Sequence, residues 1–308
     1  MKLYLAPLEG ITTYTYRNTH FEMFGGCDGY FAPFITPTEN EKVGTRVIRD
    51  ILPDKNRGIN LVPQILSNKA EAFLSFLPKI KELGYTSINL NFGCPSGTVV
   101  KKGRGAGFLK DVEGIDEFLC RIFEKTEIPV SVKTRIGFRH AEEMERLMEV
   151  YNKYPISLLI IHPRTRENYY NGVPDMEAFK KAYDASKIPV CYNGNVFSVA
   201  DFEKIRNNFP KLHSVMLGRG TIANPGIFRE IKSGERLKTA ELLAFTKALQ
   251  ERYMQVLGSE VYTLHKLKEI WMYMMWNFPD EKKLLKAIKK SSNLADLNAA
   301  TAQLPEWE

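Results

Sequence analysis

The sequence predicts an α/β fold, a (β/α)8 TIM barrel followed by a small C-terminal domain made only of helices. Three observations lead to this prediction. Eight short β-rich runs recur at wide and fairly even intervals, helical patterns lie between most of them, and the last part of the chain reads as helices only. The runs are mostly apolar throughout rather than alternating, which indicates strands buried on both faces. Eight β-α alternations in about 230 residues fit a closed barrel.

The eight expected strands are short and follow one another along the barrel part of the chain. In order they are KLYLAPL (2–8), GYFAPFI (29–35), NLVPQIL (60–66), SINLNF (87–92), PVSVKTR (129–135), LLIIHPR (158–164), PVCYNGN (189–195) and SVMLGRG (214–220). Helices are expected between most of them, for example over 68–84, 112–127 and 141–154, with Gly84 as a C-terminal cap. A doubly wound open sheet is the alternative, but APLEGITT after the first run is not the G-x-G-x-x-G turn that it would want.

The pattern changes after Pro225. Helical stretches alone follow: AELLAFTKALQERYMQVLG, TLHKLKEIWMYMMWNF, DEKKLLKAIKKSSN and LADLNAATAQL. We therefore expect two domains, the barrel over 1–235 and a helical domain over 236–308. WMYMMW (271–276) is interpreted as helix-packing core rather than as a platform for stacking bases.

Composition and charge set the class of protein. The 308 residues are 44% hydrophobic and 26% charged, which suits one large globular domain with a smaller one, and the formal net charge is +7. This excess suits a polyanionic partner without demonstrating one. The N-terminus lacks the apolar stretch of a signal peptide, and no run is long enough to span a membrane. We expect a cytoplasmic protein.

The four cysteines show no pairing pattern and no zinc spacing, so free thiols and no metal site are expected. Cys120 at helical spacing and Cys191 in an apolar strand are interpreted as core residues. Cys94, in NLNFGCPSG, could be a filler, a disulfide partner, a metal ligand, a nucleophile or an acid. Spacing argues against the disulfide and the metal, and its place at a strand end argues against a filler.

Polar and glycine-rich groups follow seven of the expected strands. They are Glu9–Gly10, Gln64, Asn91–Cys94, Lys133–Arg135, His162–Arg166, Asn193–Asn195 and Gly218–Gly220. In such barrels the chemistry lies at the C-terminal ends of the strands. Any one group could be a loop cap or a turn former, but seven at the same end indicate a site.

Two of these groups suggest a phosphate. YNGNV and LGRG supply backbone N–H groups, small residues and an arginine after the seventh and eighth strands, where barrels commonly hold one. Lys133 could bind a carbonyl or phosphate, form a Schiff base or stabilise an anionic cofactor. The Gln64 amide can donate and accept hydrogen bonds at a ring edge.

These residues carry a resemblance to the tRNA-dihydrouridine synthases, a family of flavin enzymes. It covers the whole barrel in order, and the block around Cys94 is its most specific part. The matching stretches are APLEGIT (6–12), VPQIL (62–66), NLNFGCPSGTVVKKGRGAGFLKD (89–111), PVSVKTRIGF (129–138), LIIHPRTRENYYNG (159–172), VCYNGNV (190–196) and VMLGRGTIANPGIF (215–228). The helical tail resembles the family's RNA-binding domain.

The resemblance implies FMN in the barrel mouth, NADPH or NADH as reductant, and reduction of the C5–C6 double bond of a uridine in tRNA by a monomeric enzyme. Hydride would pass from flavin N5 to C6, and a proton from Cys94 to C5. This is general acid work, and a free thiol with a pKa of about 8.5 holds its proton at neutral pH. APLEG and GCPSGTV resemble the subfamily that acts on tRNA position 16.

The same resemblance assigns the individual residues. For the flavin it implies Pro7, Leu8, Glu9, Gln64, Lys133, His162, Asn193, Gly194, Asn195, Gly218 and Arg219. For the substrate it implies Asn91, Arg135, Arg164 and Arg166. In an RNA enzyme Lys101 and Lys286 are further candidates for phosphate contacts, and the lysine-rich helix that carries Lys286 could equally be a solvated face. Many family members have Met where Leu8 stands and an acidic residue where Asn195 stands. Leucine keeps the apolar contact, whereas the Asn195 side chain departs from the family in charge.

Two other functions fit parts of the pattern. An FMN barrel acting on a free pyrimidine, like the dihydroorotate and dihydropyrimidine dehydrogenases, would also place a cysteine or serine over the flavin, but it needs no basic helical tail. A non-catalytic RNA-binding protein could use the same scaffold and would reject FMN.

Overall fold

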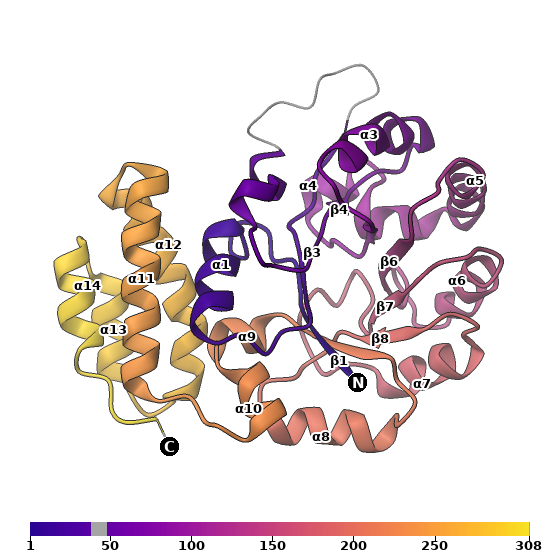
Figure 1. Ribbon diagram of the computed structural model, residues 1–308. Helices are drawn as coiled ribbons and strands as arrows, with labels where there is room; N and C mark the ends of the chain where they lie inside the picture. The colour runs from indigo at the N-terminus through magenta and orange to yellow at the C-terminus, as the bar shows by residue number, and fades with distance from the viewer. Residues whose placement is uncertain (38–47, 308) are drawn as a thin grey trace.

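The computed structural model describes residues 1–37 and 48–307 and contains a single parallel sheet rolled into a barrel (Figure 1). Its strands are β1 (Lys2–Leu5), β2 (Gly29–Phe31), β3 (Leu61–Val62), β4 (Gln64–Ile65), β5 (Ile88–Phe92), β6 (Val130–Arg135), β7 (Leu159–His162), β8 (Val190–Tyr192) and β9 (Ser214–Leu217). They are hydrogen-bonded in the order β3-β2-β1-β9-β8-β7-β6-β5-β4, and every pairing is parallel.

The strands at the two ends of this order, β3 and β4, follow one another directly in the sequence. β3 and β4 are the halves of one expected strand, interrupted at Pro63, which has no N–H to donate to a ladder. Leu61 is in register with Tyr30 of β2, whereas Gln64 is in register with Asn89 of β5. The interrupted strand thus closes the sheet. The prediction of eight barrel strands is confirmed, with this one in two pieces.

Helices surround the barrel (Figure 1). They are α1 (Tyr14–Met23), α3 (Ala70–Glu82), α4 (Gly97–Val100), α5 (Val112–Phe123), α6 (Glu143–Tyr151), α7 (Met176–Ala185), α8 (Val199–Asn208), α9 (Arg219–Ala223) and α10 (Ile227–Ser233). In α5 the buried residues Ile115, Phe118, Leu119 and Ile122 form one stripe at helical spacing. Gly84, at φ +79°, follows α3 as expected of a cap.

Several strands end earlier than the apolar runs predict. The runs expected to end at 8, 164, 195 and 220 leave the sheet after Leu5, His162, Tyr192 and Leu217. The residues expected to form the site, such as Asn193 and Gly218, therefore lie at the barrel mouth rather than in the ladder.

The C-terminal region is helical, as predicted. It contains α11 (Thr239–Leu257), α12 (Glu260–Met274), the 3-10 turn η4 (Met275–Asn277), α13 (Lys282–Lys290) and α14 (Leu294–Thr301). α11 packs on α1, where the Phe245 ring lies 5.6 Å from Tyr16 and 5.3 Å from Phe24. One hydrophobic cluster runs from the barrel helices into this region. A separate domain starting at 236 stays a prediction.

Two expectations about the core need correction. Cys191 is buried as predicted, but Cys120 lies on the exposed face of α5, because the stripe that faces the barrel passes through Leu119 instead. Trp271 is core in α12, whereas Trp276 in η4 is 49% exposed, so WMYMMW is not core throughout. Within residues 1–37 and 48–307, no helix has the length and apolar character to cross a membrane.

Candidate active site at the barrel mouth

A pocket opens at the carboxyl ends of β1, β6, β7, β8 and β9, with an empty volume of about 400 Å³ that includes open solvent. Its lining consists of Ala6, Pro7, Leu8, Lys133, His162, Tyr170, Asn193, Gly194, Gly218 and Arg219. Eight of these ten were expected in a flavin site. Ala6 and Tyr170 were not, because an alanine inside an apolar run and a tyrosine eight residues past a strand carry no local signal.

Four cations gather at this pocket without acidic partners. Among the described residues, no Asp or Glu forms an ion pair with Lys133, Arg135, Arg164 or Arg219. Burial, and next the charge of Arg135, lower the pKa of Lys133 to about 8. A buried cation with no counter-charge is costly. The cluster is therefore arranged for an anion that the protein does not itself provide.

His162 is neutral within this cluster. Burial first, and then the charges of Arg135 and Lys133, hold its pKa well below the usual value. The Arg164 guanidinium lies 3.2 Å from His162 Nε2. Because arginine can only donate, Nε2 accepts, and the ring proton belongs on Nδ1. This tautomer leaves His162 one N–H to offer to a ligand.

Arg135 and Arg164 hold a loop. Arg135 donates to the carbonyls of Gly93, Thr165 and Tyr169 at 2.8–2.9 Å. Arg164 donates to the carbonyls of two residues farther along the loop, Asn171 at 3.1 Å and Gly172 at 2.6 Å. Both side chains are almost fully buried. Their interpretation as RNA contacts stays a prediction, but what they bind in this structure is the backbone that carries Tyr169 and Tyr170.

Asn195 joins two of the cations. Its Oδ1 accepts from Arg164 at 3.2 Å and from Arg219 at 3.1 Å. An amide oxygen orients both guanidinium groups and leaves their charge in place, which a carboxylate would not do. Behind it, Asn193 donates to the Met216 carbonyl at 2.8 Å and ties β8 to β9. At Gly194 a Cβ would collide with the Tyr192 hydroxyl, so the backbone there requires glycine.

Cys94 follows β5 and is held by its own loop. The Asn91 carboxamide accepts from the backbone N–H groups of Gly93 at 3.0 Å and Cys94 at 2.9 Å. Gly105, at φ +55°, packs so close that a Cβ would lie 3.0 Å from that of Cys94. Burial raises the pKa of the Cys94 thiol, although the Ser96 backbone, Arg135 and Lys133 oppose the rise. The thiol is therefore protonated at neutral pH, as a proton donor must be.

A chain of buried amides supports Asn91. Its Nδ2 donates to Gln64 at 2.7 Å, Gln64 donates to Asn89 at 2.7 Å, and Asn89 donates to Ser131 at 2.8 Å. The sequence analysis does not single out Asn89 and Ser131, since each is one polar residue inside an apolar run. Gln64 thus uses one donor and one acceptor within the protein, and it is fully buried and does not line the pocket.

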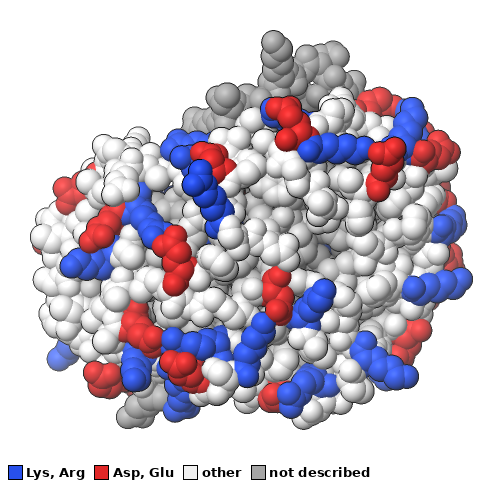
Figure 2. All heavy atoms as spheres, in the orientation of Figure 1, with Lys and Arg blue, Asp and Glu red and all other residues white. Residues whose placement is uncertain are grey.

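The other expected residues do not line the pocket. Glu9 is exposed, and partial burial of its carboxyl together with Asp50 raises its pKa. Lys101 is exposed just after α4, and Lys286 is exposed on α13. Arg166 is half-buried and donates to the Tyr169 hydroxyl at 2.7 Å. Figure 2 shows basic side chains interspersed with acidic ones over the visible face of both regions.

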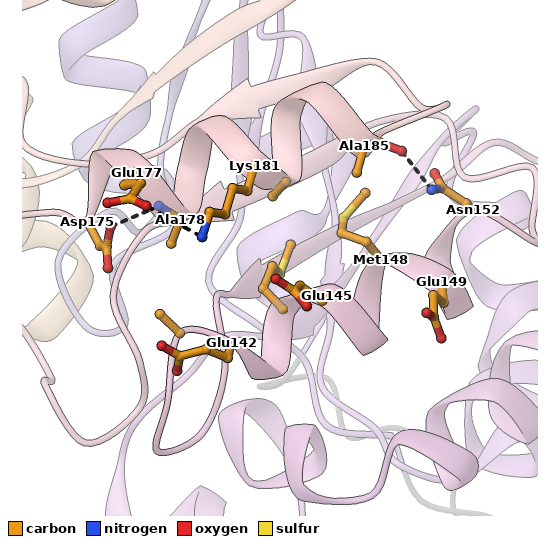
Figure 3. A pocket seen from close by; sticks show the side chains of 13 residues that line it. Glu142, Glu145, Met148, Glu149, Asn152, Asp175, Glu177, Ala178, Lys181 and Ala185 are labelled. Carbon is orange, nitrogen blue, oxygen red and sulfur yellow. Dashed lines mark hydrogen bonds and ion pairs between the residues drawn. The ribbon is translucent and has the colours of Figure 1, made fainter.

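A larger hollow lies away from the mouth, between α6 and α7 (Figure 3). Five carboxylates border it, those of Glu142, Glu145, Glu149, Asp175 and Glu177. Lys181 is its one cation, and it pairs with Glu177. An anionic ligand would be repelled there, so the barrel mouth is the better candidate site.

Comparison with known proteins gives consistent results. The model of the family described as dihydrouridine synthase (Dus) matches residues 4–305. A tRNA-dihydrouridine(16) synthase of Neisseria meningitidis serogroup B is 28% identical over 291 residues, covering 89% of this chain and 85% of that protein. The enzyme of the same name from Cupriavidus necator is 26% identical and covers 99% of this chain and 97% of that protein.

Solved structures share the barrel. A morphinone reductase mutant in complex with tetrahydroNAD superposes with a TM-score of 0.53 at 9% identity, covering 76% of this chain and 86% of that one. An old yellow enzyme from Trypanosoma cruzi gives a TM-score of 0.51 at 11% identity, covering 77% and 89%. At these identities the likeness confirms the TIM-barrel fold alone.

Proposed function

The chain belongs to the dihydrouridine synthase family, and from that premise we propose that it reduces a uridine of tRNA to 5,6-dihydrouridine with a bound flavin mononucleotide. The observation that carries the proposal is the position of Cys94, on a loop that Arg135 holds, beside a pocket whose cations have no carboxylate partner among the described residues. The relatives named above suggest uridine 16 as the target. NADPH, or NADH, is the proposed source of electrons.

The residues at the mouth fit a flavin mononucleotide. Arg219 and the backbone of Asn193 and Gly194 would hold the phosphate, and Lys133 would face the part of the ring that becomes anionic on reduction. The carboxylate-free cation cluster is what such an anion requires. When bound, the flavin supplies the hydride that uracil C6 receives.

The chain's own residues then handle the proton. Cys94 Sγ holds it and delivers it to uracil C5 while C6 receives the hydride, so the double bond gains one H⁻ and one H⁺. The resulting thiolate regains a proton from solvent. Asn91 fixes the backbone of Gly93 and Cys94, and through Gln64 the strands β4 and β5 hold Asn91. This support keeps the thiol in one place during the transfer.

The C-terminal helices are the proposed tRNA-binding domain. α13 presents Lys282, Lys283, Lys286, Lys289 and Lys290 to solvent around its buried residues Leu284 and Ile288. Such a row can neutralise phosphates over a length that a free pyrimidine would not need. We propose a monomer that acts in the cytoplasm, with 236–308 orienting the tRNA over the barrel.

The test is the variant Cys94→Ala, with Cys120→Ala as a matched control on the exposed face of α5. We expect NADPH to bleach the flavin of Cys94→Ala, whereas dihydrouridine formation on an unmodified tRNA transcript falls about 10²- to 10⁴-fold, the usual contribution of an acid. The control should keep both activities.

Three outcomes would contradict the proposal. Normal tRNA reduction by Cys94→Ala would remove the acid assignment. Reoxidation of the reduced flavin by a free pyrimidine, with none by tRNA, would favour the dihydropyrimidine dehydrogenase alternative. A colourless protein that rejects added FMN would favour a non-catalytic RNA-binding barrel.

A further inference from the structure

Four aromatic side chains from three separate segments cluster beside the pocket, and three of them face the Arg219 guanidinium. They are Tyr170 from the loop after β7, Phe197 from the loop after β8, and Tyr273 and Trp276 from the C-terminal helices, and together they are called the aromatic rim. The guanidinium carbon lies 4.8 Å from the ring centre of Tyr170, 5.7 Å from that of Phe197 and 5.9 Å from that of Trp276. Trp276 contacts Tyr273 at 5.1 Å and Phe197 at 5.6 Å.

The rim is fixed in place although two of its rings are in solvent. Trp276 is 49% exposed and Tyr170 is 44% exposed. The residue after Trp276, Asn277, donates to the carbonyl of Ala223 at 2.9 Å, which ties η4 to α9. The turn is thus anchored to the barrel, and the contacts with Tyr273 and Phe197 hold the indole itself.

Tyr170 is held in a different way. Arg135 and Arg164 bind carbonyls on both sides of it, and Tyr169 before it has φ +49°, the single left-handed non-glycine residue within 1–37 and 48–307. Such a backbone is strained and persists only where the surroundings enforce it. The strain places Tyr170 in the wall of the pocket. The rim therefore runs from the pocket outward to Trp276.

Partly exposed rings around an arginine are suited to one class of ligand. Nucleobases stack on aromatic and guanidinium planes without regard to sequence. The four cations at the pocket, which have no carboxylate partner among the described residues, carry more positive charge than the phosphate of one FMN neutralises, so a polyanion is attracted to the same place. A protein side chain could supply a ring, but it would not bring the phosphates that the neighbouring cations favour.

We propose that the aromatic rim stacks an unpaired nucleobase of the tRNA next to the target uridine. This inference rests on the proposed function. A uridine that reaches the pocket must leave its stack, and its neighbour then loses a stacking partner. Trp276, at the outer end of the rim, would replace that partner and so hold the tRNA with its uridine over the pocket.

The experiment compares the flavin-loaded full chain with Trp276→Ala, Trp276→Phe and Tyr262→Ala. Tyr262 is a matched control, a 64% exposed aromatic at the other end of α12. Affinity for an unmodified tRNA transcript is measured over a series of salt concentrations. We expect Trp276→Ala to raise the Kd about 5- to 100-fold, the usual range for one stacked base. The slope of log Kd against log salt should not change, because no ion contact is lost.

Trp276→Phe and the control complete the test. Trp276→Phe should bind within about threefold of the natural protein, because stacking needs an aromatic face and not a particular ring. Titration with tRNA should quench tryptophan emission in the natural protein more than in Trp276→Phe. Tyr262→Ala should leave the Kd and the quenching unchanged.

The outcomes separate this inference from the proposed function. If the natural protein neither binds nor reduces tRNA, the proposed function fails. If it does both and Trp276→Ala binds equally well, the rim proposal alone is overturned. Equal loss of affinity in Trp276→Ala and Trp276→Phe, together with loss of flavin, would overturn it in favour of a packing role. Unchanged tRNA affinity with an altered oligomeric state would overturn it in favour of a protein contact.

Discussion

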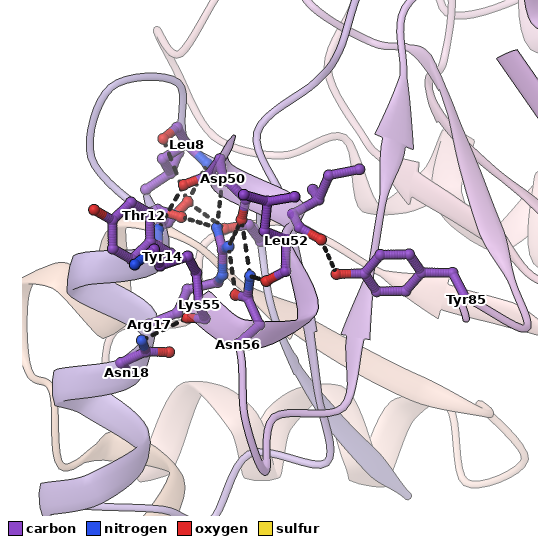
Figure 4. Close-up of polar contacts among 12 residues, drawn as sticks. Leu8, Thr12, Tyr14, Arg17, Asn18, Asp50, Leu52, Lys55, Asn56 and Tyr85 are labelled. Carbon is purple, nitrogen blue, oxygen red and sulfur yellow. Dashed lines mark hydrogen bonds and ion pairs between the residues drawn. The ribbon is translucent and has the colours of Figure 1, made fainter. Parts of the chain in front are cut away.

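Two groups of cations in this protein have opposite surroundings. Arg17 in α1 is fully buried and forms an ion pair with Asp50 at 2.8 Å. Its other donors reach the carbonyls of Thr12 at 2.7 Å and Asp50 at 2.6 Å and the amide oxygen of Asn56 at 2.8 Å (Figure 4). Lys133, at the barrel mouth, has no such partner among the described residues.

The difference indicates that the Arg17 cluster stabilises the fold, whereas the cations at the mouth are arranged to bind a ligand. The charge of Arg17 is paired with the carboxylate of Asp50. The cluster therefore ties α1 to the 3-10 turns η1 (Arg49–Ile51) and η2 (Pro53–Lys55) and to the loop that carries Glu9. At the barrel mouth the positive charges have no carboxylate partner among the described residues. Removing these charges from water costs free energy, and a bound anionic ligand can offset that cost. A buried cation that is paired with a carboxylate is structural, whereas cations gathered without one mark a site for an anionic ligand.

The largest expected effect is on the structural side of the comparison. Arg17→Met leaves Asp50 without its ion pair and the oxygens of Thr12 and Asn56 without their arginine donor, so the free energy of unfolding should fall by about 3 kcal/mol or more. Arg121→Met removes an exposed pair with Glu71 and should cost less than about 1 kcal/mol. Urea unfolding of both variants measures the contrast. Equal small effects would show that the Arg17 cluster is dispensable.

The next effect has the opposite sign. Lys133→Met should stabilise the flavin-free protein at pH 7, by no more than about 3 kcal/mol, because the pKa of Lys133 falls from 10.5 to about 8 on folding. The same variant should bind FMN more weakly, since it removes a cation from the pocket. Thermal unfolding without flavin and a flavin titration measure the two changes. A destabilised flavin-free variant would contradict the comparison.

The pH dependence of Lys133 gives a control on that result. Its pKa is lower folded than unfolded, so between pH 8 and 10.5 the unfolded chain binds more protons and stability rises with pH. Below about pH 8 both states are protonated, and the cost of the buried charge is fully present. The stability difference between Lys133→Met and the natural flavin-free protein should therefore shrink as the pH rises from 8 toward 10.5.

Much of the fold could be predicted, because local patterns determine it. Continuously apolar runs require a sheet covered on both faces, and Gly84 ends a helix through its own backbone preference. The break at Pro63 follows from the same kind of local rule, because proline has no N–H to donate to a strand ladder. The C-terminal ends of several strands lie earlier than predicted. Asn193 and Gly218 directly follow apolar runs, but the hydrogen-bonded strands end one residue before them.

The site was predicted in part. Residues next to strand ends, such as Lys133 and His162, line the pocket because the barrel brings all strand ends together. The partners of Arg135 could not be predicted, since its contacts lie 30 to 42 residues away on other loops. Tyr170 joins the pocket through those same contacts. The position of Tyr170 depends on hydrogen bonds between arginines and the carbonyls of its loop, and the spacing of residues in the sequence does not predict such contacts.

The smallest expected effect comes from a change that makes the mouth resemble the Arg17 cluster. Asn195→Asp would place a carboxylate between Arg164 and Arg219, where the amide oxygen now accepts from both. The new charge should pair with the guanidinium groups and compete with the phosphate of FMN. We expect FMN affinity to fall on the order of tenfold, about 1.4 kcal/mol.

Riboflavin isolates the cause, because it lacks the phosphate. Its affinity for Asn195→Asp should change little, so the ratio of FMN to riboflavin affinity should fall. Asn171→Asp is the matched control, since Asn171 is exposed on the neighbouring loop and adds the same charge without touching Arg219. An unchanged ratio in Asn195→Asp would mean that these arginines do not bind the phosphate. If the ratio falls equally in both variants, the cause is the added negative charge at long range and not its contact with the two arginines. The distinction between partnered and unpartnered cations would then not apply to this pocket.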